Sequence, residues 1–126
     1  DRDVAVLTNE VLRQLRVVVH TKGFPVLDVT IEHTKPIRLA FHCDAWNDTP
    51  PSIKLLQPNG DPWTEVINGS SIFHGGQTPF ICMDGSREYH GPPGNHVTDV
   101  WDNYKNQPGS SLAGILMRLV HAWRNI

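Results

Sequence analysis

Four side chains that can support catalysis or metal binding fall within residues 82–96: Cys82, Glu88, His90 and His96. The glycines and prolines between them are typical of a surface loop. A thiolate, a carboxylate and two neutral imidazoles could together ligate zinc. The same groups could instead make Cys82 a nucleophile, with a histidine as base and Glu88 holding that histidine in place. The sequence predicts a site here and leaves both kinds of chemistry open.

The spacing of these residues matches known zinc sites only poorly. Five residues separate Cys82 from Glu88, and five separate His90 from His96, whereas structural zinc sites usually contain closely spaced pairs such as Cys-x-x-Cys. Glu88 and His90 are two residues apart, so an extended backbone would present both to one side. One zinc ion therefore stays an alternative to a site that needs no cofactor.

The two cysteines stand in different surroundings. Cys43 lies in an apolar, strand-like run and is predicted to be buried. Cys82 follows three apolar residues and precedes polar, turn-forming ones, which indicates a strand ending at the surface. A domain with only two cysteines lacks a disulfide framework, which favours a reducing compartment, and we expect the cytoplasm.

Composition indicates one globular domain spanning residues 1–126. The formal net charge of -2 provides no basic field, which argues against nucleic acid as a partner. No apolar run approaches the roughly 20 residues needed to cross a bilayer, so we expect no membrane partner either.

The elements that must position these residues follow from hydrophobic periodicity. Residues 3–14 have helical spacing, and four β-rich segments follow: 15–20, 26–33, 37–42 and 53–56. Residues 61–109 read as a long loop, and a loop of that length is usually functional. Ser110 or Ser111 can cap a last helix with one apolar face, made of Leu112, Ile115, Leu116, Leu119, Val120 and Trp123. The predicted class is α+β: a helix, a four-stranded antiparallel meander, a long active-site loop and a C-terminal amphipathic helix.

This order resembles the ubiquitin-conjugating enzyme fold. Pro50-Pro51 before the fourth strand is similar to the Pro-Pro pair that marks the last strands in that family. Residues 80–84 (Phe-Ile-Cys-Met-Asp) are similar to the Ile-Cys-Leu-Asp segment around its nucleophile. Trp101 and the last helix match the tryptophan and the central helix that come after the nucleophile in that family. The chain departs from that family in three ways. His74-Gly75-Gly76 stands where the family has His-Pro-Asn, and the spacing from His74 to Cys82 is short. We also expect the helices that close the family's fold to be absent.

Cys82, Glu88, His90 and His96 also match, in order, the signature of a small bacterial Cys-Glu-His-His family. That family is predicted to bind metal and is encoded beside ubiquitin-like proteins, activating enzymes and metallo-isopeptidases. Both resemblances imply ubiquitin-like conjugation. The expected partners are a ubiquitin-like protein and its activating enzyme.

The resemblances imply a role for each residue. Cys82 would carry a ubiquitin-like protein as a thioester and pass it to an amine or hydroxyl. His90 and His96 would raise the thiolate fraction, act as general base or donate to the oxyanion. Glu88 would set a histidine tautomer or orient the acceptor.

Two alternatives belong to other functional classes. One is a zinc-binding accessory protein that uses the same four residues as ligands, which would block the sulfur as an acyl carrier. The other is an inactive interaction module that keeps the fold without the chemistry.

Overall fold

The structure, a computed structural model, describes residues 8–46 and 48–126. Its first described helix, α2, spans Asn9–Gln14 and is capped by Thr8, whose hydroxyl accepts a hydrogen bond from the Val11 N–H at 3.3 Å. The helix predicted over residues 3–14 therefore ends where expected. Residues 3–7 of that prediction lie outside the described residues.

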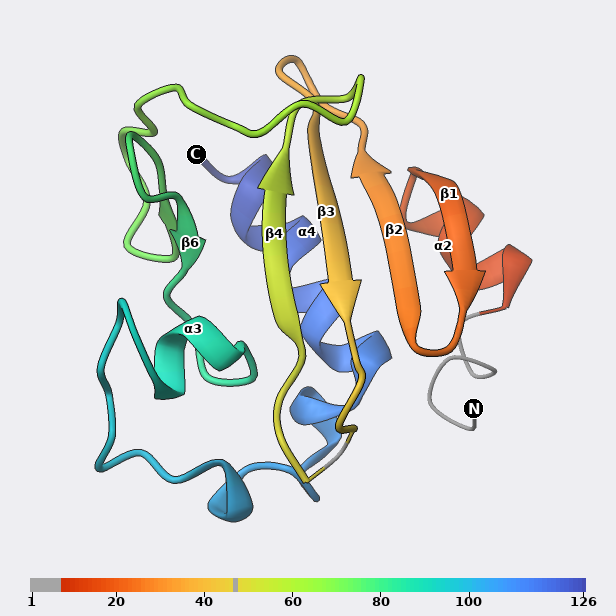
Figure 1. Ribbon diagram of the computed structural model, residues 1–126. Helices are drawn as coiled ribbons and strands as arrows, with labels where there is room; N and C mark the ends of the chain where they lie inside the picture. The colour runs from red at the N-terminus through yellow and green to blue at the C-terminus, as the bar shows by residue number, and fades with distance from the viewer. Residues whose placement is uncertain (1–7, 47) are drawn as a thin grey trace.

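A four-stranded antiparallel sheet follows in the order β1-β2-β3-β4 (Figure 1). The strands are β1 Val17–Gly23, β2 Val26–Ile31, β3 Ile37–His42 and β4 Ser52–Leu56. The predicted α+β meander is confirmed. The first strand begins two residues later than expected, because Leu15 closes α2 and Arg16 turns the chain with a φ of 54°.

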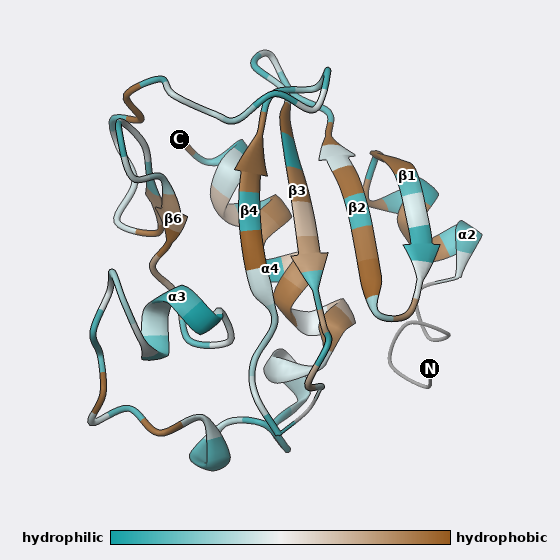
Figure 2. Cartoon of the chain, viewed as in Figure 1, coloured by the Kyte–Doolittle hydropathy of each residue, from teal (hydrophilic) through white to brown (hydrophobic). Residues whose placement is uncertain are grey.

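The core lies between one face of the sheet and the last helix, α4 (Leu112–Arg124). Figure 2 shows α4 behind the sheet, with brown apolar segments on the elements that meet. Ser111 caps α4 by accepting a hydrogen bond from the Gly114 N–H at 3.0 Å, as predicted. The predicted apolar face is the buried face: Leu112, Ile115, Leu116, Leu119, Val120 and Trp123. Within the described chain, no helix is long and apolar enough to cross a bilayer.

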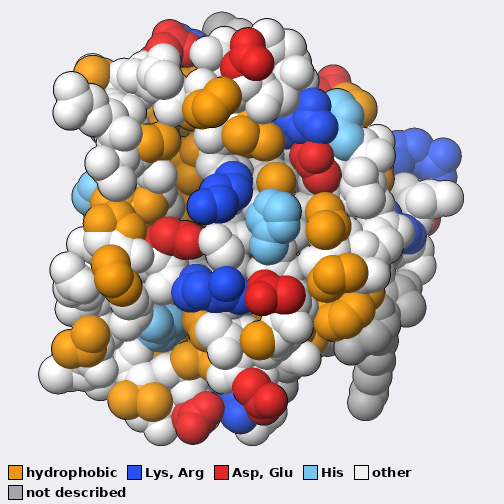
Figure 3. Space-filling model, in the orientation of Figure 1, with side chains coloured by type: hydrophobic (Ala, Val, Ile, Leu, Met, Phe, Trp, Pro, Cys, Tyr) orange, Lys and Arg blue, Asp and Glu red, His pale blue; other side chains and the backbone are white. Residues whose placement is uncertain are grey.

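The opposite face of the sheet is polar. The Arg38 guanidinium on β3 donates two hydrogen bonds to the Asp28 carboxylate on β2, at 2.9 and 2.8 Å. Figure 3 shows positive and negative side chains interspersed with apolar ones in this view, rather than gathered into a field of one sign.

The long segment between β4 and α4 contains short elements that the sequence did not predict. They are β5 Phe73–His74, β6 Phe80–Ile81, the helix α3 Arg87–His90, and the 3-10 turns η1 Trp101–Asn103 and η2 Pro108–Ser110. Two-residue strands and a four-residue helix are too short to show a hydrophobic period. Contacts with distant parts of the chain hold them in place.

The tryptophans hold this segment against the core. Trp63 and Trp123 meet edge to face at 5.8 Å between ring centroids, and Trp101 packs against Trp46 at 5.8 Å. Trp63, Trp101 and Trp123 are buried, which agrees with their predicted role as core and loop anchors.

Candidate active site

Cys82 lies at the end of β6, where the short ribbon of β5 and β6 opens into α3. Its backbone N–H donates to the Ile72 carbonyl at 2.7 Å, and its side chain is half-buried. The predicted strand end at the surface is thus present. Cys43 is 1% exposed, as predicted, and neither cysteine forms a disulfide within the described residues.

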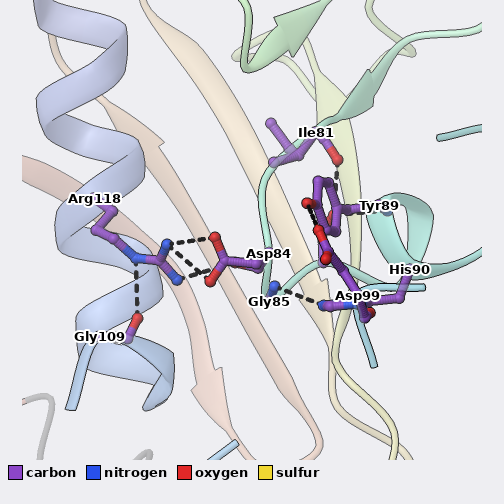
Figure 4. A network of polar contacts seen from close by, with 9 residues as sticks. Ile81, Asp84, Gly85, Tyr89, His90, Asp99, Gly109 and Arg118 are labelled. Atoms are coloured by element: carbon purple, nitrogen blue, oxygen red, sulfur yellow. Dashed lines mark hydrogen bonds and ion pairs between the residues drawn. The ribbon is translucent and has the colours of Figure 1, made fainter. Parts of the chain in front are cut away.

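The chain directly after Cys82 is clamped onto α4 (Figure 4). The Arg118 guanidinium donates to both Asp84 carboxylate oxygens at 3.2 and 3.3 Å, to the Asp84 carbonyl at 3.0 Å and to the Gly109 carbonyl at 3.0 Å. Gly85 follows with a φ of +106°, and a Cβ there would come within 3.1 Å of the Ile115 side chain. Glycine is required at this position to bring the loop close to the helix.

His96 is the candidate residue that meets the thiol. Its Nε2 lies 3.5 Å from the Cys82 Sγ, within hydrogen-bonding distance for sulfur. The imidazole stacks on the Tyr89 ring at 4.2 Å between centroids and 9° between planes. The His96 backbone N–H donates to the Tyr89 carbonyl at 3.0 Å. The structure therefore forms a cysteine–histidine pair from residues 14 positions apart.

Glu88 turns away from this pair. Its carboxylate accepts a hydrogen bond from the Ser52 hydroxyl at 2.6 Å and another from the Ile53 backbone N–H at 3.0 Å. These two bonds use both carboxylate oxygens to fasten α3 to the first residues of β4. In this arrangement Glu88 holds the scaffold and orients neither histidine.

His90 is likewise bound to backbone through both ring nitrogens. Its Nε2 accepts from the Gly85 N–H at 3.1 Å, and its Nδ1 faces the Asp99 carbonyl (Figure 4). One acceptor and one donor nitrogen correspond to the neutral tautomer with the proton on Nδ1. His90 closes the loop on itself and is not placed to take a proton from Cys82.

The four residues as arranged do not fit a zinc ion. Among residues 8–46 and 48–126, no three His, Cys, Asp or Glu side chains converge as metal ligands. To ligate zinc, Glu88 would have to break its hydrogen bonds to β4. His90 would have to break its hydrogen bonds to both of its backbone partners. Tetrahedral coordination needs four ligands on one point, and here only Cys82 and His96 meet.

Burial raises the pKa of the Cys82 thiol above its ordinary value. Desolvation disfavours the thiolate, so at neutral pH the resting sulfur is protonated. Nucleophilic attack then requires a base that takes the proton as the bond forms. His96 Nε2 is the group positioned to do so.

Tyr89 and Asp99 are site residues that the sequence reasoning missed. The Tyr89 hydroxyl donates to the Asp99 carboxylate, and this hydrogen bond, together with burial, raises the pKa of Tyr89 well above its ordinary value. Asp99 lies three residues after His96 in the same loop, which was the available signal. Nothing in the spacing indicated that Tyr89 would stack on His96.

A cavity in the described part of the chain lies away from the Cys82–His96 pair. It has a volume of about 260 Å³ and sits near the end of α4, between Trp63, Trp123 and the connection from β2 to β3. The Cys82–His96 pair does not line this cavity.

Fold and site together define an α+β protein with a cysteine–histidine pair in a long loop between its sheet and its last helix. The family model described as "Y4jH-like: Y4jH family" matches residues 25–124, and the chain belongs to that family. A relative from Sinorhizobium fredii (strain NBRC 101917 / NGR234), "Uncharacterized protein y4jH", is 35% identical over 66 residues. The match covers 52% of this chain and 30% of the relative, so it spans under a third of that protein's length.

Proposed function

We propose that this protein is an acyl carrier of the ubiquitin-conjugating type, which holds a ubiquitin-like protein as a thioester on Cys82. The observation that carries the proposal is the 3.5 Å approach of His96 Nε2 to a half-buried Cys82 Sγ. The order of meander, cysteine loop and helix supports it, since this order resembles the conjugating-enzyme fold.

In the first step, Cys82 Sγ attacks the thioester carbonyl that joins the ubiquitin-like protein to a cysteine of its activating enzyme. His96 takes the thiol proton as the new carbon–sulfur bond forms. The old carbon–sulfur bond breaks, and the proton passes to the departing thiolate. This transthioesterification needs no metal or redox partner.

In the second step, an amine or hydroxyl attacks the thioester on Cys82. His96 removes a proton from the acceptor, an amide or ester bond forms, and Cys82 leaves as a thiol. Glu88 and His90 contribute by holding α3 and the loop around the pair. A reducing compartment such as the cytoplasm would keep Cys82 free.

The test is a charging reaction with the protein, ATP, and a candidate ubiquitin-like protein and activating enzyme from the same organism. The wild type should form an adduct that a thiol reductant removes. Cys82→Ser should form a reductant-resistant oxyester, and Cys82→Ala should form nothing. Cys43→Ala is the matched control, because Cys43 is buried and should leave charging intact.

Conjugation that survives Cys82→Ala would overturn the proposal. Binding of the ubiquitin-like protein with no adduct on any variant would also overturn it, and would identify an interaction module. A non-reducing gel shows adducts and conjugates, and co-purification under native conditions shows binding without an adduct.

A further inference from the structure

A histidine that serves a cysteine as base needs a fixed orientation, and in many enzymes a carboxylate on the second ring nitrogen supplies it. Here Glu88, the carboxylate closest in sequence to His90, is bound to β4. Within the described residues, His96 Nδ1 has no hydrogen-bond partner. Something other than a carboxylate on that nitrogen must hold the His96 ring.

The Tyr89 ring is the group in contact with it. The two rings are nearly parallel, and the backbone bond from the His96 N–H to the Tyr89 carbonyl fixes the stack at its base. A parallel stack restricts rotation of the imidazole out of its plane. It therefore keeps the Nε2 edge facing the Cys82 Sγ.

Tyr89 is itself held from two directions. Its backbone N–H donates to the hydroxyl of Ser86, the buried N-cap of α3, at 3.1 Å, and its phenol donates to the Asp99 carboxylate. The Asp99 N–H donates to the His96 carbonyl at 3.1 Å. Tyr89, His96 and Asp99 thus form a closed set of contacts beside Cys82.

The same stack suits the charge that forms during the reaction. When His96 takes the proton, its ring becomes a cation on an aromatic face, which is a favourable arrangement. The Asp99 carboxylate behind the phenol has the complementary charge. The nearby Asp84 carboxylate is already paired with Arg118.

We propose that Tyr89, braced by Asp99, is the positioning residue of the site and aligns His96 with Cys82 through ring stacking. This inference rests on the proposed role of Cys82 and His96 and assigns the third member of that set. Tyr89 touches neither the sulfur nor the acyl group in this role.

The experiment measures alkylation of Cys82 by iodoacetamide at neutral pH and at alkaline pH, with both cysteine peptides quantified by mass spectrometry. Removing the ring in Tyr89→Leu should slow the neutral reaction about tenfold, because a misaligned His96 no longer takes the thiol proton as the new bond forms. The alkaline rate should match the wild type, because the thiol then ionises without help. Tyr89→Phe keeps the ring and should restore most of the neutral rate.

Equal neutral rates for Tyr89→Leu and the wild type would overturn the assignment. So would a changed alkaline rate or a newly reactive Cys43, because either shows that the leucine variant has lost its structure and that Tyr89 is only structural. Asp99→Asn, which keeps an acceptor for the phenol, is the second variant. It should fall between the wild type and Tyr89→Leu, and an Asp99→Asn protein slower than Tyr89→Leu would contradict bracing through Tyr89.

His96→Ala separates this inference from the function on which it rests. If His96→Ala alkylates like the wild type, the cysteine–histidine pair itself is wrong. If His96→Ala is slow but Tyr89→Leu is not, the pair stands and only the role of Tyr89 fails. The charging reaction remains an independent test of acyl transfer.

Discussion

Two pairs of side chains in one short segment differ in where their polar atoms find partners. Glu88 and His90, both on α3, direct their polar side-chain atoms to the protein's own backbone and to Ser52. Cys82 and His96, on either side of that helix, face each other near the surface. A polar group that is already fully hydrogen-bonded stabilises the fold, whereas chemistry needs a group with bonding capacity left. The contrast divides the four candidate residues into two that hold the scaffold and two that keep the bonding capacity that the proposed chemistry needs.

The helical backbone of α3 is the physical cause of the difference. Glu88 and His90 are two residues apart, and an extended chain would have presented them to the same side. In a helix, residues at that spacing do not face each other. Glu88 therefore reaches β4, and His90 reaches the loop that leads to α4.

The largest effect should come from Glu88→Ala. It leaves the Ser52 hydroxyl and the Ile53 N–H without their acceptor, and both residues are buried, 8% and 2% exposed. Unsatisfied buried donors cost about 1–3 kcal/mol each, so the two donors together should cost about 2–6 kcal/mol in the free energy of unfolding in urea. Glu10→Ala is the matched control, because Glu10 pairs only with exposed partners on α2. A Glu88→Ala protein as stable as that control would show that Glu88 does not hold the scaffold.

Replacing His90 should destabilise the protein more than replacing His96. His90→Ala leaves the Gly85 N–H and the Asp99 carbonyl without their hydrogen-bond partner, and it should lower the free energy of unfolding by about 1–2 kcal/mol. His96→Ala removes a more exposed ring and should cost less, within about 1 kcal/mol. Equilibrium urea unfolding of the two variants gives the comparison directly. If His96→Ala is the more destabilising, the division into scaffold and reactive pairs is wrong.

Alkaline pH should reduce the contribution of Tyr89 to the stability of the folded protein. The folded-state pKa of Tyr89 is raised above the unfolded value near 10, so its stabilising effect is complete below that value and is lost as pH rises through the folded pKa. The hydrogen bond to Asp99 is partly solvated, and we expect of order 1 kcal/mol at neutral pH. The melting temperature of wild type minus that of Tyr89→Phe should be positive at neutral pH and shrink in strong alkali. A difference that grows with pH would have the wrong sign.

Zinc should produce the smallest effect. A ligand present at 100 times its dissociation constant stabilises a folded protein by about 2.7 kcal/mol, but binding here would first have to break the bonds of Glu88 and His90. We expect no rise in melting temperature with added zinc and no zinc in freshly purified protein by elemental analysis. About one zinc per chain, lost in both Cys82→Ala and His90→Ala, would show that the two pairs join around a metal and would restore the accessory-protein alternative.

The local sequence pattern was enough to predict several helices and strands of this protein. Alternation predicted β2, the i, i+3, i+4 apolar positions predicted the buried face of α4, and Ser110 or Ser111 was predicted to cap that helix. The apolar residues before Cys82 indicated that a strand ends there. Each of these signals lies within one element, so the periodicity of a helix or strand is enough to reveal it.

Only the tertiary structure decided which of the four signature residues meet. The bond from Ser52 to Glu88 spans 36 residues, and the Arg118–Asp84 clamp spans 34. β5, β6 and α3 are too short to show a hydrophobic period, and contacts such as these hold them in place. Because a carboxylate or an imidazole can serve equally well as a scaffold or as a reagent, residue type and spacing could name Cys82, Glu88, His90 and His96. The choice between the two roles depended on partners distant in the sequence, which packing of the loop against β4 and α4 brings within hydrogen-bonding distance.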